Sequence, residues 1–217
     1  MIELVNAFIT PVSLGMIDDL SLIKDVEKIC YDKQEVQINS GRQLTKEALG
    51  EGYGGFQMEF HNKNKTTYCP GIKELPTMKK FCDVVTDRVN ETIELMGVEG
   101  PRSIGIQSGW FNLNKKGDYA PEHSHVQSHL SAVIFIKGEG KDCGNLVLKD
   151  IDVRKEMNSF YLPPIQKNVN NYNNHRYFVV PKPGRFAIFP AHVKHLVEIN
   201  QSDEDRISIA MDLTIHV

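Results

Sequence analysis

Beyond Pro101, apolar and polar residues alternate along the chain, and this pattern limits the possible fold most strongly. A period of two is typical of β-strands with one buried face, because successive side chains point to opposite sides of a sheet. We predict strands over residues 104–113, 125–137, 145–148, 177–180, 186–189, 195–199 and 207–215. Turn signals such as N-K-K-G-D and P-K-P-G separate these runs. Several short strands at such spacing favour a β-sandwich or barrel.

Two stretches of the first hundred residues have the helical period instead. One begins near Asp18 and the other spans residues 72–96. We therefore predict a mainly β protein whose N-terminal helices pack on a jelly-roll-like core. We expect a single domain over residues 1–217, with a helical support region over about residues 1–100 and the jelly-roll core over about residues 101–217.

The composition excludes some classes of protein. The 217 residues are 41% hydrophobic and 24% charged, and the formal net charge is -3. This balance is typical of a globular protein and lacks the excess of basic residues that a nucleic-acid-binding surface needs. The longest apolar run, residues 130–136, is too short to cross a membrane. We expect neither a nucleic acid nor a membrane as partner.

The four cysteines are scattered and form no C-x-x-C pair, which indicates reduced thiols rather than a disulfide framework. The N-terminal residues M-I-E-L-V-N-A-F-I-T-P lack the features of a secretory signal peptide. We therefore expect a soluble protein in the cytoplasm, or in the host cytoplasm if the chain is viral.

Histidines gather just before the apolar run L-S-A-V-I-F-I, at His123, His125 and His129. His123 and His125 are two residues apart, so in a strand both imidazoles would point to one face. A later segment, F-A-I-F-P-A-H-V-K-H-L-V, offers His192 and His195. We favour His195 as a third ligand because it lies inside the predicted strand that follows. His129 is not expected to bind a metal.

Three ligands on one face would leave open coordination positions, which is typical of a catalytic metal site. Imidazole suits Fe, Zn, Cu and Ni. Glu122 and Asp118 could add a carboxylate, although Glu122 would point away from His123 in a regular strand. The alternative interpretation is that all these histidines are structural and bind no metal, and His175 is assigned to that class.

Two known families have H-x-H at the mouth of a β-barrel. The segment 117–125 resembles the first cupin motif, G-x5-H-x-H, and P-A-H-V-K-H resembles the second, with His192 in place of a glycine. The cupin glutamate that follows H-x-H is missing. A cupin-like metalloprotein that does not use 2-oxoglutarate is therefore one alternative, and a non-enzymatic β-sandwich module is another.

The second family is the Fe(II)/2-oxoglutarate-dependent oxygenases, and the resemblance is to a short branch found in phages and bacteria. It covers most of the chain in order: G-G-F-Q, W-F-N with a later glycine, H-S-H before the apolar strand, the segment 181–195, and R-I-S-I-A. It implies a double-stranded β-helix core and an enzyme that uses Fe(II), 2-oxoglutarate and O2. Such an enzyme hydroxylates its substrate and releases succinate and CO2.

The resemblance implies metal ligands at His123, His125 and His195. The common triad of this superfamily has a carboxylate where His125 stands. Either three histidines hold the iron, or His125 lies outside the coordination shell and water takes its place. We favour three histidines.

The resemblance also implies a co-substrate site. Arg206 follows His195 by eleven positions, where a basic residue holds the distal carboxylate of 2-oxoglutarate, and a guanidinium suits that task because it binds carboxylates through two parallel bonds. Ser208 shares its strand face. Trp110 and Asn112 are expected to line the pocket, and Ser131 to face the co-substrate. The substrate, a small molecule or a peptidyl group, is not identified, and homo-oligomer formation is left open.

Overall fold

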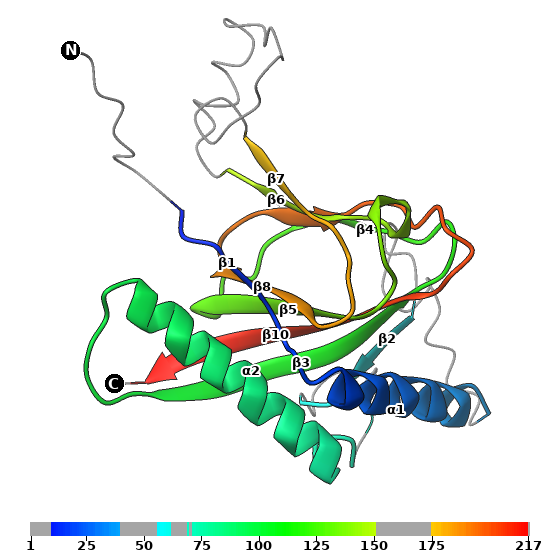
Figure 1. The fold of residues 1–217 in the computed structure, drawn as a ribbon, viewed down its shortest axis with the longest axis horizontal. Coiled ribbons are helices and arrows are strands. Elements are labelled where there is room, and N and C mark those ends of the chain that lie inside the picture. The colour runs from blue at the N-terminus through cyan, green and yellow to red at the C-terminus, as the bar shows by residue number, and fades with distance from the viewer. Residues whose placement is uncertain (1–9, 40–55, 62–68, 70, 151–174, 217) are drawn as a thin grey trace, which may run out of the picture.

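The computed structural model describes residues 10–39, 56–61, 69, 71–150 and 175–216, which fold into two antiparallel sheets, two α-helices and one short 3-10 helix (Figure 1). The strands of the six-stranded sheet are, in spatial order, β1 (Ser13–Met16), β8 (Arg185–Pro190), β5 (Leu130–Lys137), β10 (Arg206–His216), β3 (Ser103–Asn114) and β2 (Phe56–Glu59). The strands of the four-stranded sheet are β4 (Ala120–His123), β9 (His195–Val197), β6 (Leu146–Lys149) and β7 (Arg176–Val179). The predicted mainly β, jelly-roll core with N-terminal helices is confirmed.

The two helices cover the outer face of the six-stranded sheet. These are α1 (Leu20–Asn39) and α2 (Pro76–Leu95) (Figure 1). Alternate residues of β10, such as Ile209 and Met211, are fully buried there in one cluster with Phe81 of α2. Burial of this apolar face is what attaches the helices to the sheet, because each apolar side chain removed from water contributes roughly 1.5–3 kcal/mol.

The residues between these positions on β10 point into the space between the two sheets. A second and smaller apolar cluster fills part of that space and includes Val133, Phe135, Leu148 and Phe189. Ala210 of β10 packs against it. Polar residues on the same inner face, among them Arg206, therefore lie in a largely apolar interior.

The structure corrects three details of the predicted elements. The strand expected over residues 125–137 begins at Leu130, and the residues before it form the separate strand β4 and a turn. Strand β2 lies in a glycine-rich region for which no strand was predicted. Helix α2 begins at Pro76 rather than at residue 72, because proline has no amide hydrogen to donate and suits the first turn of a helix.

No helix in the described part of the chain is long and apolar enough to cross a membrane. The four cysteines are free thiols, as predicted.

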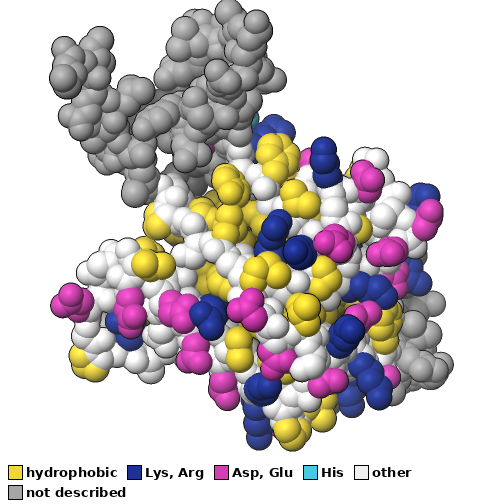
Figure 2. Space-filling view, viewed as in Figure 1, with side chains coloured by type: hydrophobic (Ala, Val, Ile, Leu, Met, Phe, Trp, Pro, Cys, Tyr) yellow, Lys and Arg dark blue, Asp and Glu magenta, His cyan; other side chains and the backbone are white. Residues whose placement is uncertain are grey.

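Acidic and basic side chains are interspersed on the face shown in Figure 2. The described residues of that face therefore carry no concentrated basic patch of the kind that binds nucleic acid.

Gly144 holds the short helix η1 (Lys141–Cys143) close to the end of β9 and is expected to tolerate no side chain. Its φ is +81°, and a Cβ atom would overlap the main-chain carbonyl of Glu198. Gly144→Ala should lower the free energy of unfolding by about 2–4 kcal/mol, from left-handed backbone strain and overpacking. Chemical denaturation would measure this loss. Gly117→Ala is the control, because Gly117 has a similar φ of +88° but open space around it.

Candidate metal centre

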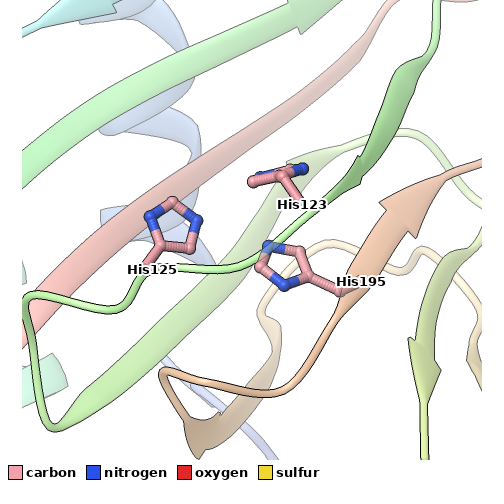
Figure 3. Close-up of side chains that lie close together, drawn as sticks. All are labelled: His123, His125 and His195. Carbon is pink, nitrogen blue, oxygen red and sulfur yellow. The ribbon is translucent and has the colours of Figure 1, made fainter. Parts of the chain in front are cut away.

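The four-stranded sheet brings two of the predicted histidines face to face. His123 is the last residue of β4 and His195 the first of β9, and they are direct cross-strand partners. His125 follows in the turn after β4, where its amide donates a 2.8 Å hydrogen bond to the carbonyl of Ala191. One ligand atom from each histidine lies within 4.8 Å of the other two (Figure 3). The turn after β4 therefore brings the imidazole of His125 close to those of His123 and His195, which we had expected from a regular strand.

Main-chain carbonyls orient two of these rings. Nδ1 of His123 lies 2.8 Å from the carbonyl oxygen of Pro121, and Nδ1 of His195 lies 3.0 Å from that of Val193. A carbonyl oxygen only accepts hydrogen bonds, so each Nδ1 carries the proton in the neutral ring. Nε2 is then left with a free electron pair, which is the state that a metal ligand needs.

The electrostatics of the site also favour neutral imidazoles. Burial, followed by the neighbouring His123, lowers the pKa of His195 to about 3. Burial lowers the pKa of His123 as well. Uncharged rings in a partly dry site fit a divalent cation, because a ligating histidine must be deprotonated at the binding nitrogen.

The ring of His125 has a different partner. Its Nδ1 lies 3.2 Å from Oδ1 of Asp212, which also accepts a 3.3 Å hydrogen bond from the hydroxyl of Ser131. The indole of Trp110 packs against the same imidazole, with ring centroids 5.6 Å apart. Phe189 packs against His195 at 5.1 Å. These contacts restrict the rings to the orientations that converge in Figure 3.

The other candidates from the sequence lie outside this cluster. His192 is exposed, which agrees with the preference for His195. His129 accepts a hydrogen bond from the amide of Ile215 at 2.8 Å. Glu122 points away, toward the ammonium of Lys149 at 2.6 Å.

Arg206 is the largest fully buried side chain of the inner face, with an exposed fraction of 1%. One nitrogen, Nη1, donates to Oδ1 of Asn114 at 3.1 Å and lies 3.5 Å from the hydroxyl of Ser208. The ring of Phe135 lies 5.2 Å from the guanidinium carbon. Nε and Nη2 have no hydrogen-bond partner among the described residues. Burial lowers the pKa of Arg206 to about 10, so the guanidinium is charged at neutral pH.

A buried cation with two unused donors is costly unless an anion meets it. The donors of Arg206 therefore fit a carboxylate that enters the space between the sheets. Ser208 and Ala210 lie between Arg206 and Asp212 on the same face of β10, so one strand connects this cation with the histidine cluster.

The structure places the remaining predicted residues around this space. Asn112 is the register partner of Ser208, and its Oδ1 accepts a 2.9 Å hydrogen bond from Nε2 of Gln57. Ser131 is buried beside Asp212.

Sequence reasoning missed Asn114 and Asp212. Both could have been found by parity, because Asp212 shares the alternation of Arg206, and Asn114 that of the predicted pocket residue Asn112.

Comparison with known proteins supports the resemblance. Residues 108–212 match a family model described as "Putative 2OG-Fe(II) oxygenase". The matched region begins on β3 and ends at Asp212, so it contains the histidine cluster and Arg206. The match favours the oxygenase resemblance over the cupin one. No curated protein sequence gave a significant match.

Solved structures share the fold at low sequence identity. A Pseudomonas putida prolyl-4-hydroxylase is 13% identical, with a TM-score of 0.57 over 94% of this chain and 92% of its own. The epimerase SnoN, solved with Fe3+, alpha ketoglutarate and nogalamycin RO, is 13% identical, with a TM-score of 0.58 over 94% of this chain and 79% of its own. A viral collagen prolyl hydroxylase from Paramecium Bursaria Chlorella virus-1, in a 2OG complex, is 10% identical, with a TM-score of 0.50 over 95% and 96%.

At these identities the structural likeness establishes the jelly-roll fold alone. The oxygenase assignment rests on the family model. The oxidoreductase class expected from the motifs is confirmed. Over residues 108–212, which hold the histidine cluster and Arg206, this chain matches the model of the 2OG-Fe(II) oxygenase family.

Proposed function

We propose that the chain is a dioxygenase that uses Fe(II), 2-oxoglutarate and O2 to hydroxylate its substrate. The balanced reaction converts a C–H bond to C–OH, while 2-oxoglutarate becomes succinate and CO2. Bound iron would supply the oxygen and redox chemistry, and the protein would supply orientation and a dry site. The observation that carries the proposal is Arg206, a buried cation with two unpartnered nitrogens on the inner face that also reaches the histidine cluster.

His123, His125 and His195 would hold the iron through Nε2. The hydrogen bonds at Nδ1 of His123 and His195, and the 3.2 Å contact between Nδ1 of His125 and Oδ1 of Asp212, support this assignment. Because all three side chains come from the mouth of the jelly roll, they would occupy one side of the metal. The other positions would remain for co-substrate and oxygen.

Arg206 would bind the distal carboxylate of 2-oxoglutarate with Nε and Nη2, and the hydroxyl of Ser208 would donate a further hydrogen bond. Asn114 would keep the guanidinium in place through Nη1.

Phe135 and Val133 would exclude water from the co-substrate, which strengthens charge-assisted bonds. Asn112 and Trp110 would form part of the pocket wall, and Ser131 would act through Asp212.

The substrate class follows only coarsely. The structural neighbours include prolyl hydroxylases and an enzyme of nogalamycin biosynthesis. We propose a small-molecule or peptidyl substrate, bound at the open side of the histidine cluster.

Turnover in the absence of substrate tests the proposal. With ascorbate supplied as the two-electron reductant in place of a substrate C–H bond, protein loaded with Fe(II) is expected to convert 2-oxoglutarate to succinate slowly under air, and to stop when iron is removed by a chelator. Mass spectrometry would measure the succinate. Tight iron binding with neither succinate formation nor 2-oxoglutarate binding would contradict the proposal and favour a cupin-like metalloprotein.

A further inference from the structure

Asp212 places a carboxylate against one of the proposed ligands, and nothing in the sequence motifs assigns it a role. It lies on β10 opposite Ser131 of β5 and Ser108 of β3. Its Oδ1 faces Nδ1 of His125 at 3.2 Å and Ser131 Oγ at 3.3 Å. The side chains of His125 and Asp212 are only 18% and 14% exposed, so solvent screens the contact weakly.

Asp212 is not a member of the group of ligand atoms that lie within 4.8 Å of one another. It lies behind the ring of His125, on the Nδ1 side. An ionised carboxylate only accepts hydrogen bonds, so this contact favours a proton on Nδ1 and a free electron pair on Nε2. A carboxylate in this position also makes the imidazole a stronger donor to a metal.

The three histidines therefore differ in what holds them. Neutral main-chain carbonyls orient His123 and His195, whereas a carboxylate faces His125. His125 is also the residue that stands where the common facial triad has its own carboxylate. The negative charge that this position usually supplies directly is thus present one residue further from the metal.

We propose that Asp212 is a positioning residue that fixes the tautomer of His125 and supplies, through its ring, the negative charge missing from the ligand set. This inference rests on the proposed function, because it requires His125 to bind the metal. Ser131 would keep Oδ1 directed at the ring.

Metal affinity tests this role without relying on activity. Loss of such a carboxylate partner commonly weakens metal binding by about 10- to 100-fold. We expect that loss for Asp212→Ala, and a smaller loss for Asp212→Asn, whose amide oxygen can still face Nδ1 of His125 but carries no charge. Competition with a chromophoric chelator, using Fe(II) without oxygen and Co(II) in air, would measure both.

The control removes the same charge from a neighbouring place. Glu122 lies on β4 next to His123, but its carboxylate pairs with Lys149 and Lys194. Glu122→Gln should therefore change metal affinity by less than about twofold, because solvent-exposed ion pairs contribute little. Equal losses in Glu122→Gln and Asp212→Ala would mean that overall charge explains the effect, and would overturn the inference.

The tautomer of His125 can be observed in the metal-free protein. Long-range nitrogen–proton NMR spectra are expected to show a proton on Nδ1 of His125 in the wild type and a mixture of tautomers in Asp212→Ala. A variant that keeps both the tautomer and the metal affinity of the wild type would overturn the inference while leaving the proposed function intact. Failure of the wild type itself to bind Fe(II) would contradict the proposed function instead. If Asp212→Ala does not fold, the nearly isosteric Asp212→Asn decides by the same two measurements.

Discussion

His195→Ala is expected to weaken Fe(II) binding by more than about 100-fold, a larger loss than the removal of a partner behind a ligand would cause. His195 is 4% exposed and has a lowered pKa of about 3, so it offers a neutral ring in an almost dry position. The proposed site would keep His123 but lose the imidazole that lies opposite it on the neighbouring strand. Anaerobic titration with Fe(II) would measure the dissociation constant.

His192→Ala is the matched control, because it removes the same side chain three residues earlier from an exposed position. It should leave the Fe(II) dissociation constant within about twofold of the wild type, since a substitution on the surface rarely changes more. Thermal unfolding of the metal-free proteins would separate lost binding from lost structure. Unchanged iron affinity in a folded His195→Ala variant would show that the ligand set is wrong.

Arg206→Leu is expected to separate co-substrate binding from metal binding. Two charge-assisted hydrogen bonds to a carboxylate are worth about 1.5–3 kcal/mol each. Their loss should raise the dissociation constant of 2-oxoglutarate by roughly 100-fold or more. Fe(II) affinity should stay within a few-fold of the wild type, because Arg206 does not belong to the histidine cluster. Anaerobic calorimetric titration of the metal-free protein with Fe(II), and then of the iron-loaded protein with 2-oxoglutarate, would measure the two constants.

The same substitution should not destabilise the protein in the absence of ligands. Nε and Nη2 of Arg206 have no partner in the described structure, so leucine removes a costly buried charge. The loss of the bond to Asn114 works in the opposite direction. We expect the unfolding temperature of the metal-free variant to equal or exceed that of the wild type. A purely structural arginine would give the reverse: strong destabilisation together with normal 2-oxoglutarate affinity.

The part of the β core that could be predicted best is strand β10, because its apolar and polar or small residues alternate. Residues 207–215 have apolar side chains toward the helices and polar or small ones toward the inner space, and β10 has that arrangement. The strand expected over 125–137 was too long, because residues 125–129 are mostly polar and form the turn before β5. The structure brings the rings of His123 and His125 together with that of His195, although not through the regular strand that was expected. The hydrogen bond from the main-chain amide of His125 to the carbonyl of Ala191 holds the turn so that the rings still lie close together.

Other parts of the site depend on contacts that are distant in sequence. A carboxylate partner was sought at Glu122 and Asp118 because they lie close to H-x-H. The structure instead places Asp212 beside His125, 87 positions later, through the pairing of β10 with β5. Strand β2 escaped prediction because glycines precede it, and its pairing with β3 brings Gln57 to Asn112. Periodicity within one segment contains no information on such pairings.

The most direct test of the central claim is an anaerobic titration of metal-free protein, first with Fe(II) and then with 2-oxoglutarate. Absorbance would be followed in the visible region, where chelation of Fe(II) by 2-oxoglutarate gives a weak charge-transfer band. We predict that the band appears in the wild type after the second addition, and that Arg206→Leu needs far more 2-oxoglutarate to reach it. Iron binding without the band would contradict the co-substrate site, and the absence of iron binding would mean that His123, His125 and His195 are structural.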